Sequence, residues 1–145
     1  MLAVVTESEP EAAEASPDEV AFTLTWLPDG DALKGELEAR NVGERRVRLS
    51  GKPSLTPLGV DGQPLDTVAI ITLELAVPGY VELDPGEAAT ARVGWAGWDG
   101  LTAGGAVRVE WPGGQADVAT LGPRQPAGNG PPTNLWSSWF VKVDC

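Results

Sequence analysis

A strict alternation of apolar and charged side chains between positions 33 and 40 restricts the fold of this chain more than any other feature. Small or apolar residues alternate there with charged ones: Leu33, Gly35, Leu37 and Ala39 against Lys34, Glu36, Glu38 and Arg40. A period of two places the two sets on opposite faces of a β-strand, one against a core and one in water. The segment therefore predicts an antiparallel sheet with one solvated face.

The same two-residue period recurs along most of the chain, which predicts an all-β fold. The segments that carry it are 20–27, 47–49, 53–58, 68–77, 81–83, 89–95, 107–111, 116–120 and 139–143. Turn sequences separate them, such as Asp84-Pro85-Gly86-Glu87, in which proline presets the first corner and glycine suits the second. Short strands at this spacing are typical of a two-sheet antiparallel sandwich with immunoglobulin-like Greek-key connections and about eight or nine strands.

The stretch from Leu37 to Leu58 is predicted to fold as a hairpin. Asn41 and Gly43 are residues that readily adopt the left-handed backbone of a tight turn, and they follow one strand directly. Val47 and Leu49 then begin a second strand. Because each proline removes a backbone donor, the continuation from residue 53 to residue 58 is expected to be an edge or bulged strand.

The charge distribution excludes two classes of partner. The net charge is −11, and six acids without a single base lie in the first twenty residues: Glu7, Glu9, Glu11, Glu14, Asp18 and Glu19. Such a field repels nucleic acid phosphates and anionic lipid headgroups, so we expect no nucleic acid partner. Arg46 and Arg48, in the predicted hairpin, are expected to point outward as a charged edge that resists aggregation.

The length of 145 residues indicates one folded domain. Residues 1–18 are expected to form a flexible acidic linker, because they combine Glu, Ala, Ser and Pro with little that can be buried. Residues 19–145 would form the sandwich. Within it, residues 122–133 are so rich in glycine and proline that they predict a long loop.

Histidine and cysteine usage argues against an enzyme. The chain has no histidine and one cysteine, Cys145, which excludes zinc sites, histidine-based triads and an internal disulfide. It also lacks a Gly-x-Ser-x-Gly elbow and a phosphate-binding loop. We therefore expect no enzymatic activity and no cofactor. No segment is apolar for long enough to cross a bilayer, so direct membrane insertion of this chain is not expected.

Tryptophans supply the first candidate site. Trp95, Trp111 and Trp139 share strand faces with valine and are expected in the core, which leaves Trp98 and Trp136 as the candidates for exposure. Exposed indole rings are the groups on which sandwich domains commonly stack sugar rings. Trp98 and Trp136 are therefore the predicted ligand-binding residues.

Aspartates in the predicted turns supply a second candidate site. Asp29 and Asp31 flank Gly30, and their carboxylates offer the oxygen ligands that calcium prefers. Their spacing matches no EF-hand, and aspartate beside glycine is ordinary turn chemistry. We therefore assign no metal to the chain and keep this pair as a weak calcium alternative.

Several motifs together resemble an immunoglobulin-like domain of unknown function that occurs in exported proteins and lipoproteins of actinobacteria. They are Asn41-x-Gly43 with Val47-x-Leu49-x-Gly51-x-Pro53, then Asp61-Gly62-x-Pro64, then Leu83-x-Pro85-Gly86-x-x-Ala89-x-Ala91 continuing to Trp95. The resemblance implies a β-sandwich that is exported or attached to the cell surface, and it brings no catalytic residues. That family usually carries cysteine pairs, one of them near the position of Val47, and this chain has none inside the domain.

These observations favour a non-catalytic extracellular or cell-surface interaction or structural module, and a removed N-terminal anchor would supply its tether. Its partner would be an unknown protein or a cell-envelope glycan. Two alternatives stay open: a carbohydrate-binding module that uses Trp98 and Trp136, and the sensor ectodomain of a membrane-anchored regulator.

Overall fold

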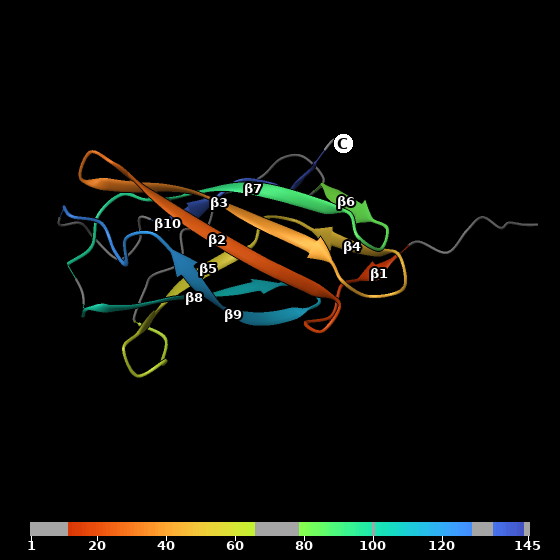
Figure 1. Ribbon diagram of the computed structural model, residues 1–145, viewed down its shortest axis with the longest axis horizontal. Helices are drawn as coiled ribbons and strands as arrows, with labels where there is room; N and C mark the ends of the chain where they lie inside the picture. The colour runs from red at the N-terminus through yellow and green to blue at the C-terminus, as the bar shows by residue number, and fades with distance from the viewer. Residues whose placement is uncertain (1–11, 66–78, 100, 129–134, 144–145) are drawn as a thin grey trace, which may run out of the picture.

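The computed structural model describes residues 12–65, 79–99, 101–128 and 135–143, and within them the chain is all-β, as predicted (Figure 1). Eleven strands and no helix occur in these residues. In chain order the strands are β1 (Ala13–Glu14), β2 (Val20–Asp29), β3 (Ala32–Asn41), β4 (Val47–Ser50), β5 (Ser54–Gly59), β6 (Tyr80–Leu83), β7 (Ala88–Trp95), β8 (Ala103–Trp111), β9 (Gly114–Leu121), β10 (Leu135–Ser137) and β11 (Val141–Lys142).

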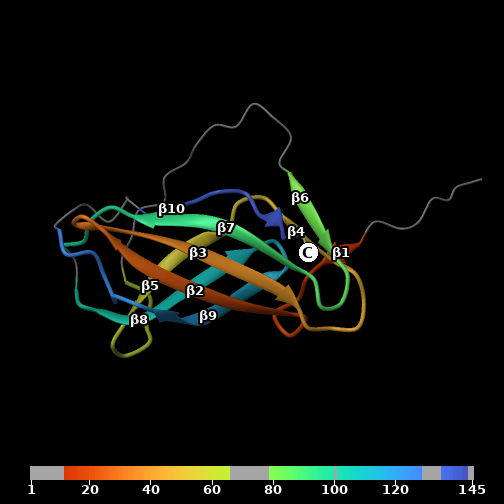
Figure 2. The same ribbon diagram turned by 45° about the horizontal axis from the view of Figure 1, so that its top comes forward.

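The strands form two sheets of unequal size. A small sheet has the order β1-β4-β6, and a large one has the order β10-β7-β3-β2-β9-β8-β5, with β11 also paired to β7. The small sheet lies at one end of the molecule, at the right in Figures 1 and 2. Two sheets were expected, but the pairing is not purely antiparallel, because β1 runs parallel to β4 and β2 runs parallel to β9.

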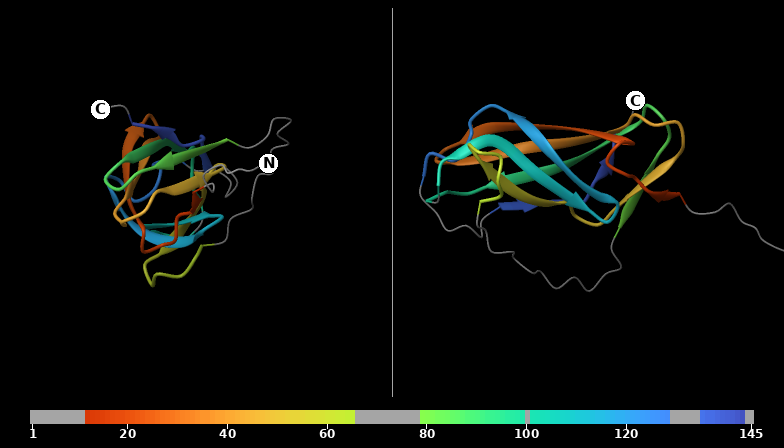
Figure 3. Two further views of the ribbon diagram at one scale, coloured as in Figure 1. Left: turned by 90° about the vertical axis from the view of Figure 1, so that its right-hand side faces the viewer. Right: turned by 90° about the horizontal axis from the view of Figure 1, so that it is seen from below.

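The large sheet curls until its two edges approach each other around the core (Figure 3, left). The edge strands β10 and β5 are linked at this point, where the Ser137 hydroxyl donates a hydrogen bond of 2.6 Å to the carbonyl oxygen of Pro53. The right-handed twist of each strand accumulates across a sheet of this width, which favours such a curl. The inner side chains of all its strands therefore share one core.

The alternation between positions 33 and 40 is confirmed as the centre of the large sheet. β3 is paired on one side with β2 and on the other with β7, so Leu37 lies between Leu24 and Ala91. All three side chains are buried. Burying a leucine side chain stabilises a fold by about 2 kcal/mol relative to leaving it exposed.

The predicted hairpin between Leu37 and Leu58 is wrong. β3 does end at Asn41 and β4 does begin at Val47, but β4 pairs with β6 and β1, with Val47 opposite Leu83. The chain therefore crosses from the large sheet to the small one between residues 41 and 47. It returns to the large sheet at β5, which pairs with β8. From β6, in the small sheet, it crosses to β7 in the large sheet through the predicted turn at 84–87, where Gly86 has a φ of +87°.

Asn41 explains why the chain crosses here. Its side chain is buried, and its Nδ2 atom donates hydrogen bonds to the carbonyl oxygens of Arg45 and Leu83, at 2.8 and 2.9 Å. Its Oδ1 atom accepts a hydrogen bond from the backbone N–H of Gly43. Backbone bonds also join Asn41 to Gly86 and Glu87. Asn41 thus connects the β3–β4 crossover turn with the β6–β7 crossover turn.

The described part of the expected linker, residues 12–18, packs against the sheets. Ala13–Glu14 form β1 beside β4, and Ala15 is buried. The indole N–H of Trp111 donates a hydrogen bond of 2.7 Å to the carbonyl oxygen of Ala15. The acidic composition gave no sign of this strand, because two residues are too few to establish a period.

The middle of the chain contains the predicted bulged edge strand and a tight hairpin. β5 is the outer strand of the large sheet, and its register with β8 shifts between Pro57 and Gly59, as expected for a bulged edge. β8 and β9 form an antiparallel hairpin that closes with Trp111 opposite Gly114. Both features follow from proline and glycine chemistry close to the strand ends.

The prediction for the last strand, at 139–143, assigned the wrong side chains to the buried face. Trp139, Val141 and Val143 were expected to share the inner face, yet Phe140 is the buried side chain and both valines are exposed. The chain leaves β10 after Ser137 and pairs with β7 again only at Val141, so the alternation shifts by one residue between the two. The expected strand at 68–77, the end of the expected loop (129–133) and Cys145 lie outside the described residues.

Candidate functional site on the outer face of the large sheet

One row of residues crosses four neighbouring strands of the large sheet on its outer face. Leu27 of β2 lies opposite Lys34 of β3, Lys34 lies opposite Gly94 of β7, and Gly94 lies opposite Trp136 of β10. The next row on the same face contains Glu36 opposite Arg92. We call this surface the Trp136 face, comprising Leu27, Lys34, Glu36, Arg92, Gly94 and Trp136.

The indole of Trp136 lies against the backbone of its neighbouring strand. A Cβ atom built on Gly94 would collide with the Nε1, Cε2 and Cζ2 atoms of Trp136, so the ring occupies the space that a side chain at position 94 would fill. The glycine is buried beneath it, while 53% of Trp136 remains exposed. Glycine at this position therefore lets an aromatic ring rest on the sheet with much of its surface in solvent.

Hydrogen bonds on both sides hold the short strand that carries Trp136. On one side, the Ser137 hydroxyl donates to Pro53 beside β5. On the other, the backbone N–H of Ser138 donates to the carbonyl of Arg92, and the N–H of Arg92 donates to the Ser138 hydroxyl, both at 2.8 Å. The same bonds fix the backbone of Arg92, so the positions of Trp136 and Arg92 are coupled.

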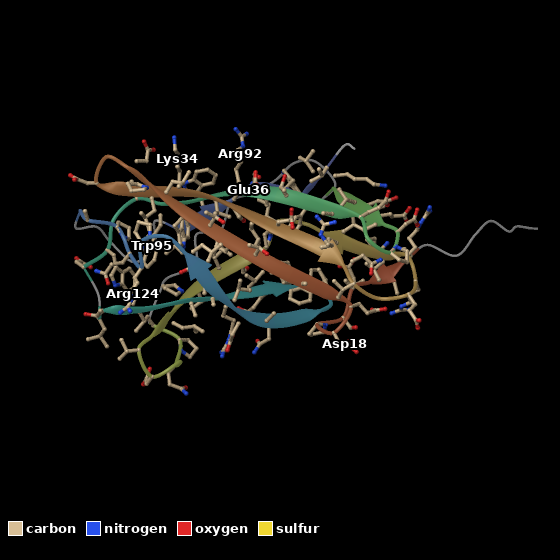
Figure 4. All side chains as sticks on the ribbon, viewed as in Figure 1. Asp18, Lys34, Glu36, Arg92, Trp95 and Arg124 are labelled. Carbon is tan, nitrogen blue, oxygen red and sulfur yellow. The ribbon has the colours of Figure 1, made fainter. Side chains whose placement is uncertain are left out.

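The charged side chains of the Trp136 face extend outward together. Figure 4 shows Lys34, Glu36 and Arg92 rising from the same side of the sheet, whereas Trp95 lies between the layers. Within the described residues, none of these three charged side chains forms an ion pair. Farther along the same face, Glu38 and Arg40 do pair, at 3.6 Å. The charges nearest to Trp136 are therefore the ones that remain available.

The charged edge expected at Arg46 and Arg48 is not an edge, because β4 lies between β1 and β6 in the small sheet. Arg46 pairs with Asp84 at 2.7 Å and Arg48 pairs with Glu14 at 2.7 Å, while Arg45 pairs with Glu19. These arginines connect β4 and its preceding loop to neighbouring segments. The positive charges of these three arginines are therefore paired with carboxylates of the chain itself.

The ion pairs of this region perturb the titration of their carboxylates. The hydrogen bond from Arg45, with help from the backbone N–H of Ser16, lowers the pKa of Glu19 from 4.5 to about 2. The hydrogen bond from Arg46 likewise lowers the pKa of Asp84. Both shifts reflect structural pairing, so neither carboxylate is a candidate proton donor or acceptor.

Trp98, the second predicted ligand-binding residue, is not exposed. Only 3% of it is accessible, and its ring packs edge-on against Trp95 with centroids 5.3 Å apart. Its indole N–H donates to the carbonyl of Leu101, and its backbone N–H donates to Gly128. The loop after β7 folds back over the end of the core, so Trp98 fills that end. Trp98 and Trp136 therefore do not form a joint platform.

The remaining tryptophans divide between core and surface. Trp95 and Trp111 are buried, as predicted, but Trp139 is partly exposed, with the Lys52 ammonium 5.5 Å from its ring centroid. Trp26, which pattern alone also placed inside, packs against Trp95. Of the indoles in the described residues, that of Trp136 is the one classed as exposed.

The two aspartates considered as calcium ligands, Asp29 and Asp31, have no third acidic side chain grouped with them in the described residues. Asp29 and Asp31 are exposed on either side of Gly30 in the β2–β3 turn. Among the residues that the structure describes, no three acidic, cysteine or histidine side chains form a group that could hold a metal ion. In the same residues, no helix has the length and apolar character that a bilayer crossing requires.

Sequence reasoning found Trp136 but missed the two cations beside it. Lys34 was correctly placed on the outer face by alternation, and so was Arg92. Their lack of a carboxylate partner depends on side-chain positions in neighbouring strands, which the sequence does not specify. Gly94 was the available signal, because a glycine inside a strand often marks the close approach of another group.

Comparison with known proteins gives a family without an assigned activity. No curated protein matches the chain. A family model described as a domain of unknown function, DUF4232, matches residues 11–136. The match begins just before β1 and ends at Trp136, so it includes the small sheet, strands β2, β3, β5, β7, β8 and β9 of the large sheet, and the Trp136 face. The chain belongs to the DUF4232 family.

Proposed function

We propose that this chain is a non-catalytic binding module and that the Trp136 face is its ligand-binding surface. The observation that supports this proposal is the exposed indole held on the backbone of Gly94. Burying a large aromatic side chain is favourable, so a half-exposed tryptophan on a rigid sheet is available for a partner. The unpaired charges around it would give the contact its specificity.

The proposal includes an extracellular location, at or beyond the cell surface. Its support is the resemblance of the turn and core motifs to exported actinobacterial domains and lipoproteins. An immunoglobulin-like Greek key is also part of the proposal. Two sheets connected by crossovers at β3–β4 and β6–β7 support that topology. In this location the partner would be a surface protein or a cell-envelope glycan.

Photocrosslinking in the native cells would test this surface. A benzophenone amino acid would replace Leu27, which is 55% exposed on the Trp136 face, or Tyr80, which is 56% exposed on the small sheet. We expect a covalent adduct from position 27 that disappears in a Trp136→Ala background, and none from position 80. Adducts that form equally at both positions, or that persist without Trp136, would overturn the proposal.

A carbohydrate ligand is the second candidate, and Trp136 specifically favours it. An aromatic ring lying on a flat sheet face can stack on the apolar face of a pyranose ring. Retention of the chain on insoluble cellulose, chitin and peptidoglycan would test this version. Retention on at least one polymer should be lost in Trp136→Ala and kept in Tyr80→Ala. If no polymer retains the chain, a protein partner takes precedence.

A further inference from the structure

The charges of the Trp136 face narrow the ligand further. We propose that the face binds an acidic oligosaccharide, with one sugar ring stacked on Trp136 and the carboxylates of the sugar held by Lys34 and Arg92. This inference rests on the proposed function of the same face. It adds the chemical class of the ligand and the two side chains that select it.

Most lysines and arginines of this chain form ion pairs with its own carboxylates. All ten lysines and arginines lie in the described residues. Six of them form ion pairs with carboxylates: Arg40, Arg45, Arg46, Arg48, Arg108 and Lys142. Lys52 lies over the ring of Trp139. The cations that remain are Lys34, Arg92 and Arg124.

This remainder is unexpected for a chain with twenty-one acidic residues and ten basic ones. Carboxylates outnumber cations about two to one, so most surface cations find a partner, as six of them do here. Lys34 and Arg92 nevertheless form no ion pair within the described part of the chain, and both extend from the same side of the large sheet (Figure 4). The register places Trp136 on this face as well. Arg124 lies apart from them in the same view, toward the opposite side of the molecule.

The register places both cations within reach of a sugar on the indole. Lys34 is directly opposite Gly94, on which the ring rests, and neighbouring strands are about 5 Å apart. Arg92 precedes Gly94 by two residues on the same face of β7, which corresponds to about 7 Å along the strand. An acidic ring stacked on Trp136 would therefore have an ammonium beside it and a guanidinium one step away.

Arg92 is suited to a carboxylate because its guanidinium can donate two parallel hydrogen bonds. Its backbone is fixed by both hydrogen bonds to Ser138, so only the side chain has to adjust. Glu36 lies between the two cations in the register and can accept hydrogen bonds from sugar hydroxyls. Its negative charge also disfavours ligands with densely spaced anionic groups, which points to one carboxylate per sugar ring.

The overall charge of −11 favours short ligands over long polyanions. Repulsion from distant acids is screened beyond about 8 Å at physiological ionic strength, whereas contacts within the face are not. The experiment should therefore use short oligosaccharides at about 0.15 M salt. Recognition is then decided by the residues of the face rather than by the field of the whole molecule.

A matched pair of ligands isolates the role of charge. Calorimetric titration of the full chain with oligogalacturonate, and with the same oligosaccharide after methyl esterification, compares a ligand with charged carboxylates and one with the same sugar backbone whose carboxyl groups are neutral methyl esters. We expect binding of the acidic form and at least tenfold weaker binding of the ester. Lys34→Ala and Arg92→Ala should each weaken binding of the acidic form about threefold to tenfold. Arg124→Ala should leave it unchanged and serves as the matched control.

The outcomes separate this inference from the proposed function. Equal binding of the acid and the ester, lost in Trp136→Ala, would overturn the inference and leave the face as the binding surface. The inference would also be overturned if the chain binds neither form of oligogalacturonate and binds no alginate or hyaluronate oligosaccharide. The crosslinking at position 27 would then be the remaining test of the proposed function. Binding of the acid that survives both Lys34→Ala and Arg92→Ala would assign the charge selection to other residues.

Discussion

The end of the molecule that contains β1, β4 and β6 uses its charged and polar side chains differently from the Trp136 face. At the crossover end, around β1, β4 and β6, arginines pair with carboxylates and a buried amide connects the turns. On the Trp136 face, Lys34 and Arg92 form no ion pair with any residue that the structure describes, and the aromatic ring is exposed. The first region uses polar groups to hold two sheets together, and the second leaves them available to a ligand. Substitutions should therefore affect stability at one and binding at the other.

The largest expected effect on stability is at Asn41. Asn41→Ala would remove the buried amide that donates to Arg45 and Leu83, leaving two carbonyl oxygens without their partner. Since each unsatisfied buried group costs about 1–3 kcal/mol, we expect a loss of about 2–4 kcal/mol in the free energy of unfolding. Urea denaturation would measure it.

Asn41→Asp provides the matched control for that change. It has nearly the same shape and keeps the acceptor for the N–H of Gly43, but it cannot donate to the two carbonyls. We expect a loss at least as large as that of Asn41→Ala, because Asp lacks the donor and also places a buried negative charge opposite two carbonyl oxygens. A change below about 0.5 kcal/mol for both variants would remove Asn41 as the link between the crossovers.

The next effect concerns the support beneath Trp136. Gly94→Ala would place a methyl group where the indole lies, so the ring must leave the sheet. Overpacking of this kind costs about 1–3 kcal/mol, and ligand binding at the face should be lost with it. Acrylamide quenching of tryptophan fluorescence should increase, because the displaced ring enters solvent.

Gly79→Ala is the matched control for Gly94→Ala. A Cβ atom at position 79 would meet Trp139 at 3.8 Å, an ordinary contact. This variant should change stability by less than about 0.5 kcal/mol and leave quenching unaltered. If the two alanine variants behave alike, the indole of Trp136 does not depend on Gly94.

A smaller effect compares one arginine from each region. Arg48 donates to Glu14 and lies 5.6 Å from the ring centroid of Tyr80, whereas Arg92 forms no ion pair within the described residues. Arg48→Ala should cost about 1 kcal/mol, and Arg92→Ala less than about 0.5 kcal/mol, in urea denaturation. Equal costs would contradict the division of the cations into structural and free groups.

The sequence predicts the strands better than their partners. The alternation from Leu33 to Arg40 correctly gives a strand, its buried face and its solvated face, because these depend only on the period. Asn41 and Gly43 indicate a change of direction but not which strand comes next. That choice is decided by hydrogen bonds from Asn41 to residues as distant as Leu83, which no local pattern contains.

The candidate site was half predictable for a related reason. Trp136 was expected at the surface and lies there, but Trp98 was expected beside it and is buried. Trp98 follows the end of β7, where the alternation that separates inside from outside has stopped. The free charge of Lys34 and Arg92 depends on what every other carboxylate contacts, which is a property of the folded molecule. Patterning therefore identifies faces, whereas pairing and availability require coordinates.

The smallest expected effect is on the pH dependence of stability, through the ion pair between Glu19 and Arg45. The pKa of Glu19 is held near 2 in the folded chain by Arg45, compared with 4.5 for an unperturbed glutamate. As the pH falls below about 4.5, the unfolded chain binds a proton at this carboxylate before the folded chain does, so the stability that the pair contributes is lost progressively toward pH 2. Glu19→Gln should therefore show a shallower loss of stability over this interval in thermal melts.

Glu44→Gln is the control for this change. It removes the same charge from a residue without an ion pair in the described part of the chain, and its stability should fall with pH as steeply as that of the wild type. A Glu19→Gln slope that matches both would show that the pair between Glu19 and Arg45 contributes no more to the pH dependence of stability than the carboxylate of Glu44.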